Sequence, residues 1–167
     1  RNALNNEREE FKRITELVQQ YAINNPGVSF TLKRKNEPQA TLHTQSTATI
    51  KDNIRQFFLK DVHKNLIEFD HSCDNLDFKV HGYFTGPNYS SKKSTFILFV
   101  NKRLVTCRDI KKGIESTIEP FLPKGTHPFV YMHLQVNPAR VDVNVHPTKK
   151  EVRILNQDTI IEEIQKK

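Results

Sequence analysis

The segment 95–100 (TFILFV) constrains the fold of this chain more than any other stretch. Every residue after Thr95 is apolar, so the segment lacks the alternation of polar and apolar residues that marks a strand with one face in solvent. A short unbroken apolar run is typical of a strand that is covered on both faces. The run therefore predicts a central strand, buried on both faces of its sheet.

Apolar residues at helical and strand spacings surround this run. Helical spacing predicts helices over residues 11–22, after Thr47 as an N-cap, over 109–121 and over 158–167. Alternation predicts strands over residues 28–32, 40–44, 66–71, 78–85, 129–136 and 141–145, with Gly82 marking a bulge. Together these elements predict an α+β fold, in which helices pack against a mixed sheet. No linker-like stretch divides the pattern, so residues 1–167 are expected to form a single domain.

The composition favours a basic domain in a reducing compartment. The net charge is +7, which favours a polyanionic partner such as nucleic acid, nucleotide phosphates or an acidic membrane surface, with an idle basic surface as the alternative. Cys73 and Cys107 lack metal-ligand spacing and are interpreted as small buried thiols. No apolar run approaches the ~20 residues of a membrane-spanning helix. The start at Arg1 has no signal-peptide pattern, and the chain is expected to be a piece excised from a longer one.

The segment 141–155 (VDVNVHPTKKEVRIL) combines a half-buried strand with a cationic turn. Valines alternate with polar residues up to His146, and Pro147 then ends the strand because it cannot donate a ladder hydrogen bond. Lys149 and Lys150 follow on a tight loop before the sheet resumes. The ammonium of a lysine on a short loop between two strands can bind a phosphate. The simpler interpretation is a solvated lysine on a turn.

The predicted helix over residues 109–121 has an apolar and a basic side. Isoleucines repeat along the first, and Arg108, Lys111 and Lys112 stand on the second. Clustered cations are typical of contacts with nucleic-acid phosphates, and a solvated helix face is the alternative. Further cations stand in neighbouring loops, at Lys92, Lys93, Lys102 and Arg103. Because no aromatic residues are interleaved with these cations, we expect recognition of the backbone with little sequence preference.

The segment 141–155 resembles the signature at the end of the N-terminal ATPase region of the MutL family of DNA mismatch repair proteins. The segment 96–116 (FILFVNKRLVTCRDIKKGIES) resembles the same family's strand, turn and basic helix. The segment 122–152 is close to the MutL homolog one subunits of eukaryotes. Their post-meiotic-segregation partner subunits usually have threonine at the position of His146 and aspartate at that of Thr148, which argues against that branch. The resemblance spans the whole chain and is strong from Phe96 onward.

This resemblance implies that the chain is the transducer domain, the second domain of the ATPase region. An upstream GHKL domain similar to those of gyrase and the Hsp90 chaperone would bind ATP and magnesium, and the transducer fold would contain a left-handed βαβ crossover like that of GHMP kinases. By the same resemblance, Lys149 contacts the γ-phosphate of ATP, and Arg108, extended by Lys111 and Lys112, binds DNA. His146 is expected to be structural, and neither a catalytic residue nor a metal ligand is expected in the chain.

The resemblance also implies partners for the complete protein. These are DNA, a MutL-family partner subunit in a heterodimer and a MutS-family mismatch recognition protein, acting in the nucleus and not at a membrane. A dimerisation domain is expected downstream. Because the sequence has only five glycines and no Gly-rich phosphate loop, the chain alone is expected neither to bind ATP tightly nor to hydrolyse it, and to need no cofactor of its own.

Two other classes of protein remain as alternatives. A GHMP-type small-molecule kinase fragment would share the fold, but the missing Gly-rich loop argues against it. A free-standing nucleic-acid-binding domain would use the same cations, and its Lys149 would have no phosphate partner. A GHKL domain encoded just upstream would support the first interpretation over both.

Overall fold

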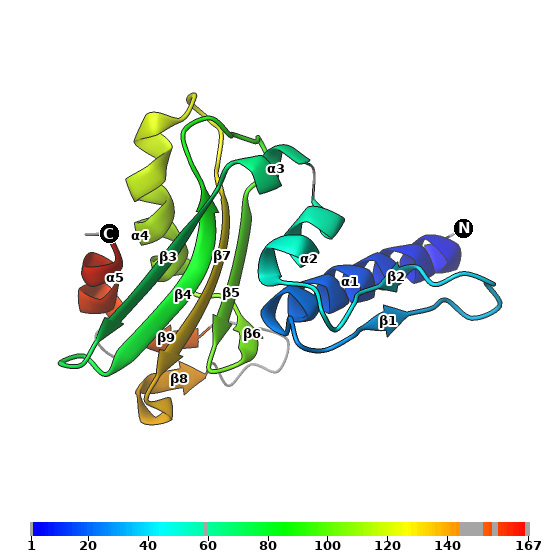
Figure 1. Ribbon diagram of the computed structural model, residues 1–167, viewed down its shortest axis with the longest axis horizontal. Helices are drawn as coiled ribbons and strands as arrows, with labels where there is room; N and C mark the ends of the chain where they lie inside the picture. The colour runs from blue at the N-terminus through cyan, green and yellow to red at the C-terminus, as the bar shows by residue number, and fades with distance from the viewer. Residues whose placement is uncertain (1, 59, 144–151, 155–156, 166–167) are drawn as a thin grey trace. The chain divides into compact units, whose positions relative to one another are not determined.

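The computed structural model describes residues 2–58, 60–143, 152–154 and 157–165, which form the ribbon in Figure 1. The chain divides into two compact units, Arg1–His63 and Lys64–Lys167. The boundary falls in a short helix, α3 (Lys60–Lys64), and not in a stretch rich in proline, glycine or serine. The sequence therefore carries no linker-like mark of this division. No helix in the described part of the chain is both long and apolar enough to cross a membrane.

The first unit consists of two helices and a small two-stranded sheet. Its elements are α1 (Asn2–Asn24), β1 (Thr31–Leu32), β2 (Leu42–His43) and α2 (Ile50–Phe57). The strands pair antiparallel, as the two predicted alternating segments suggest, but each is only two residues long. The buried amide of Asn53 on α2 donates a hydrogen bond of 3.0 Å to the carbonyl oxygen of Ala22 on α1, which fixes the two helices against each other.

The N-cap of α2 is Thr49, so the prediction of Thr47 was wrong. The hydroxyl of Thr49 accepts from the backbone N–H of Asp52, and the carboxylate of Asp52 accepts from the backbone N–H of Thr49. This reciprocal pair requires an acidic or amide side chain three residues after the cap. Thr49 has Asp52 in that position, whereas Thr47 has Ile50. The same backbone and hydroxyl bonds lower the pKa of Asp52.

The second unit is built on a five-stranded sheet with the strand order β3-β4-β7-β5-β6. The strands are β3 (Leu66–Cys73), β4 (Phe78–Thr85), β5 (Thr95–Val100), β6 (Arg103–Val105) and β7 (Phe129–Val136). Neighbouring strands are antiparallel, except that β5 and β7 are parallel. The predicted α+β fold with a mixed sheet is therefore confirmed.

Strand β5 is an interior strand, with β7 on one side and β6 on the other. Ile97, Leu98, Phe99 and Val100 are all buried, at 0–3% exposure. Because successive side chains of a strand point to opposite faces, this burial confirms the prediction of a strand covered on both faces. Strand β6 was not predicted. It follows a tight turn in which Asn101 and Lys102 have positive φ, and it is only three residues long.

Gly82 lies in a regular ladder, so the predicted bulge was wrong. It pairs with Phe69 on β3 and with Met132 on β7, and the register is unbroken on both sides. A bulge would place two residues opposite one. The glycine is needed for space instead, since a Cβ at this position would lie 2.1 Å from the backbone oxygen of Tyr131 and 2.8 Å from the ring of Phe69.

Two helices cover one face of this sheet (Figure 1). Helix α4 (Arg108–Ile118) continues into a 3-10 turn (Glu119–Phe121), which accounts for the predicted end at Phe121, and α5 (Gln157–Gln165) closes the described chain. The helices and the sheet share a core that includes Ile110, Ile114, Ile160, Leu98, Val130 and Met132.

A separate pair of strands precedes α5. Strand β8 (Val141–Val143) pairs antiparallel with β9 (Val152–Ile154). The predicted strand that begins at Val141, and the predicted return of the sheet at Val152, are confirmed for these residues. The backbone N–H of Val152 donates to the carbonyl oxygen of Thr106 at 2.9 Å, which joins β9 to the chain just before α4.

Candidate functional site

The basic side of α4 is exposed to solvent. Ile110 and Ile114 are 0% and 6% exposed, whereas Arg108, Lys111 and Lys112 are all exposed. At 3.6 residues per turn, the three cations lie within an arc of about 100° around the helix. The structure therefore brings the three predicted DNA-binding residues together on one side of one helix.

The other predicted cations do not form a single patch. Lys92 and Lys93 are exposed just before β5, and Lys102 and Arg103 are exposed just after it. A strand of this length separates the two pairs by roughly 20 Å. Each pair therefore lies at its own end of the sheet.

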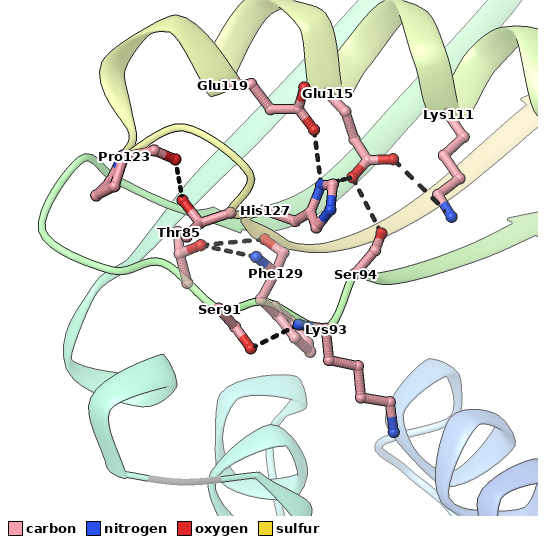
Figure 2. Close-up of polar contacts among 11 residues, drawn as sticks. Thr85, Ser91, Lys93, Ser94, Lys111, Glu115, Glu119, Pro123, His127 and Phe129 are labelled. Carbon is pink, nitrogen blue, oxygen red and sulfur yellow. Dashed lines mark hydrogen bonds and ion pairs between the residues drawn. The ribbon is translucent and has the colours of Figure 1, made fainter.

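A histidine and two glutamates form a cluster beside the C-terminal half of α4 (Figure 2). His127 Nδ1 lies 2.8 Å from Glu119 Oε1 and 3.6 Å from Glu115 Oε2. The hydroxyl of Ser94 donates to Glu115 Oε2 at 3.0 Å, and the ammonium of Lys111 lies 4.0 Å from Glu115 Oε1. These contacts tie α4 to the chain segments that lead into β5 and β7.

We interpret this cluster as an ion-pair network. In the described part of the chain it is the one group of three side chains whose possible metal-ligating atoms lie within 4.8 Å of one another. Magnesium prefers a shell of oxygen ligands and water, whereas here a histidine nitrogen already pairs with Glu119 and an ammonium lies beside Glu115. The cluster therefore does not fit the magnesium of an ATPase. Its role is to satisfy the buried carboxylate of Glu115, which is 7% exposed.

The sequence does not reveal this cluster. Glutamates four residues apart are common on exposed helix faces, and His127 follows a turn-rich connector. The turn returns the chain to α4, where Ser91 and His127 pair through backbone hydrogen bonds of 3.0 and 2.7 Å. This pairing is tertiary, so no local pattern predicts it.

The predicted phosphate-binding residue Lys149 lies outside the described residues, as do His146, Pro147 and Lys150. The structure describes the strands on either side of them. Val141 pairs with Ile154, Asp142 with Arg153 and Val143 with Val152. In sequence, the segment with Lys149 therefore connects two strands that pair with each other.

A histidine on β7 has an altered protonation equilibrium. His133 is partly buried, and its Nε2 accepts a hydrogen bond of 3.1 Å from the backbone N–H of Lys102. Burial lowers the pKa of His133, and the neighbouring His81 and Lys102 lower it further. The neutral imidazole is thus the favoured form.

Comparison with known proteins gives a consistent result. The family model described as "DNA mismatch repair protein, C-terminal domain" matches residues 54–167. The DNA mismatch repair protein Mlh1 of Dictyostelium discoideum is 41% identical over 100% of this chain, and MLH1 of Saccharomyces cerevisiae is 41% identical over 97% of it. The DNA mismatch repair protein MutL of Halothermothrix orenii is 37% identical over 94% of the chain. The chain spans 22–24% of the length of these relatives.

Solved structures share the fold. The N-terminal domain of a DNA repair protein superposes with a TM-score of 0.74 at 21% identity, over 95% of this chain and 50% of that one. The ATPase domain of the mismatch repair endonuclease MutL from Aquifex aeolicus superposes with a TM-score of 0.60 at 16% identity, over 95% of this chain and 51% of that one. Together with the family model, which matches more than half of its residues, these findings show that the chain belongs to the MutL and MLH1 family of DNA mismatch repair proteins.

Proposed function

We propose that this chain is the DNA-binding and nucleotide-sensing transducer domain of a MutL-type ATPase. The observation that supports the DNA-binding part is the exposed basic side of α4, with Arg108, Lys111 and Lys112 within one arc of the helix. We infer that these cations contact the phosphates of the DNA backbone, which position a protein on DNA but carry no sequence information. Family membership argues against the alternative of a GHMP-type kinase.

Lys111 has an acidic neighbour on the same helix. The ammonium of Lys111 lies 4.0 Å from the carboxylate of Glu115, which offsets part of its charge. Glu115 should therefore lower the contribution of Lys111 to DNA affinity.

The nucleotide-sensing part of the proposal depends on Lys149. The name of the Aquifex relative describes an ATPase domain, and this chain corresponds to 51% of its length. We infer that ATP and magnesium are bound by the remainder of the complete protein, and that Lys149 contacts the γ-phosphate from this domain. An ammonium next to a phosphate is held by charge, so loss of the phosphate would release the contact. ATP binding and hydrolysis would in this way control closure of the paired N-terminal regions.

The family suggests partners for the complete protein. We propose a MutL-family partner subunit, a MutS-family mismatch recognition protein and DNA. The relatives with 41% identity are eukaryotic, which favours the nucleus, although bacterial MutL proteins match as well.

The test of DNA binding is charge reversal on α4. Arg108→Glu should weaken binding of the N-terminal half of the protein to duplex DNA about equally for all sequences. The slope of log K against log salt concentration should fall by about 0.9, the value of one phosphate contact. Fluorescence anisotropy titrations at several salt concentrations measure both quantities.

Arg8→Glu provides the matched control, because Arg8 is exposed on α1 and the change in net charge is the same. A general effect of net charge would weaken binding equally in both variants. If Arg108→Glu bound DNA at low salt with wild-type affinity, the basic side of α4 would not be the DNA site.

A further inference from the structure

Helices α4 and α5 contact each other through the backbone at Gly113. A Cβ on Gly113 would lie 2.5 Å from Cγ2 of Ile161, which is closer than real Cβ atoms come to a neighbour. At the end of α5, Gln165 Nε2 donates to the carbonyl oxygen of Gly113 at 2.6 Å. We call the set Asp109, Gly113, Gln157, Ile161 and Gln165 the α4–α5 clamp.

Gln157, the first residue of α5, makes the other polar contacts of the clamp. Its Nε2 donates to the carboxylate of Asp109 in the first turn of α4. Its Oε1 accepts from the backbone N–H of Ile154 at 3.2 Å and from the thiol of Cys107 at 3.6 Å. Ile154 ends β9, and Cys107 is the N-cap of α4. One amide side chain therefore holds the end of β9 and the start of α4 together.

Strand β9 is attached to the start of α4 at a second point. The backbone N–H of Val152 donates to the carbonyl oxygen of Thr106, two residues before α4 begins. In sequence, Lys149 lies only three residues before β9. In space, β9 is bonded to the chain next to Arg108. A restraint on the Lys149 segment thus has a short route, through hydrogen bonds and packed helices, to the basic side of α4.

We propose that the α4–α5 clamp couples the nucleotide to the DNA-binding side of α4, with Gln157 as its positioning residue. This inference rests on the proposed function, in which Lys149 binds a phosphate and α4 binds DNA. A phosphate bound to Lys149 restrains β9, and Gln157 transmits that restraint to Asp109 and the first turn of α4. Without the bonds of Gln157, each site still binds its own ligand, but neither affinity depends on the other.

The experiment compares DNA affinities of the full-length protein in complex with its partner subunit. The Kd for duplex DNA is measured with and without the non-hydrolysable analogue adenylyl imidodiphosphate. The ratio of the larger Kd to the smaller one reports the coupling. We expect a ratio of about tenfold or more for the wild type. Gln157→Leu keeps a side chain of similar length without its hydrogen bonds. It should lower the ratio at least about fivefold, while the Kd without nucleotide stays within about twofold.

Two further variants separate coupling from folding. Gln135→Leu makes the same substitution at an exposed position of β7, outside the clamp, and should keep the wild-type ratio. Gln165→Leu removes the bond at the other end of α5 and should lower the ratio as well. The temperature of thermal unfolding shows whether Gln157→Leu folds. If it does not fold, Gln165→Leu tests the coupling in its place.

The outcomes distinguish the inference from the function on which it rests. If Lys149→Ala abolishes the coupling but Gln157→Leu and Gln165→Leu both keep the wild-type ratio, the clamp is not the route. A similar loss of DNA affinity with and without nucleotide would make Gln157 a structural residue and also overturn the inference. A wild-type ratio of one would overturn nucleotide sensing itself, and the clamp with it.

Discussion

His133 gives the second unit a dependence of stability on pH. Its pKa is lowered in the folded chain from the ordinary value of 6.5, chiefly by burial. Below neutral pH the unfolded chain therefore binds more protons at this residue than the folded chain does. Stability rises with pH wherever the unfolded state binds more protons, so the contribution of His133 becomes less favourable as the pH falls through 6.5.

Replacement by glutamine tests this expectation, because glutamine can still accept from the N–H of Lys102 but does not titrate. Urea unfolding at pH 7.5 and pH 5.5 should show a smaller loss of unfolding free energy in His133→Gln than in the wild type. The imidazole resonances of His133 should titrate below the ordinary pKa. An identical pH dependence in the two proteins would contradict the expectation.

Single residues were predictable where their environment is local. The exposure of Arg108, Lys111 and Lys112 follows from helical spacing alone, because the isoleucines between them define the buried side. The pairing of His127 with Glu115 and Glu119 was not predictable, since it depends on how a connector returns to α4. That missed pairing changes the expected contribution of Lys111 to DNA binding.

At the scale of elements, Gly82 shows how packing decides the amino acid on a strand. Gly82→Ala would force a Cβ against the carbonyl oxygen of Tyr131, which belongs to the backbone of β7 and cannot move aside alone. We expect a loss of about 3 kcal/mol in the free energy of unfolding, near the upper end for overpacked sites. Urea unfolding followed by circular dichroism measures the change.

Gly27→Ala is the control for this substitution, since a Cβ there would meet no atom within 4 Å. Its effect should stay below about 1 kcal/mol, in either direction. Equal stability of Gly82→Ala and the wild type would mean that β4 and β7 adjust easily, and that the close approach is not a constraint.

Helices and strands were predicted where the pattern of apolar residues is long, and were missed where the element is too short to show a pattern. The apolar run of β5 and the isoleucine repeat of α4 are long enough to identify their elements. Three-residue β6 has no periodicity to detect, and it exists because a tight turn at Asn101 and Lys102 reverses the chain beside β5. The N-cap of α2 follows from the sequence, because Thr49 has an acidic residue three positions later and Thr47 does not.

At the scale of the whole molecule, the chain corresponds to a small share of each relative that it matches. It spans 22–24% of the length of its relatives and divides into two compact units. That division was not visible in the sequence because a helical turn, α3, spans the boundary. Within the second unit, β8 pairs with β9, β9 is hydrogen-bonded to Thr106 just before α4, and Gln157 of α5 is hydrogen-bonded to Asp109 of α4. Nucleotide sensing and DNA binding are thus proposed for segments that share one scaffold.

Lys149→Ala tests the nucleotide-sensing part in the complete protein. A charge-assisted hydrogen bond to a phosphate is worth about 1.5–3 kcal/mol, so its loss from the transition state should slow ATP turnover about tenfold or more. Folding should change little, since lysine side chains seldom belong to a hydrophobic core. Steady-state hydrolysis and thermal unfolding, measured on the same preparation, separate the two effects.

Lys150→Ala is the matched control, because it removes the same charge from the next residue. If the γ-phosphate contact belongs to Lys149, turnover in Lys150→Ala should stay near the wild-type rate, and the two variants should have similar thermal stability. Equal slowing in both would indicate a general effect of positive charge near the nucleotide. Wild-type turnover in Lys149→Ala would remove the sensor role from this residue. It would leave the DNA-binding role of α4 untouched, because Arg108→Glu tests that role separately.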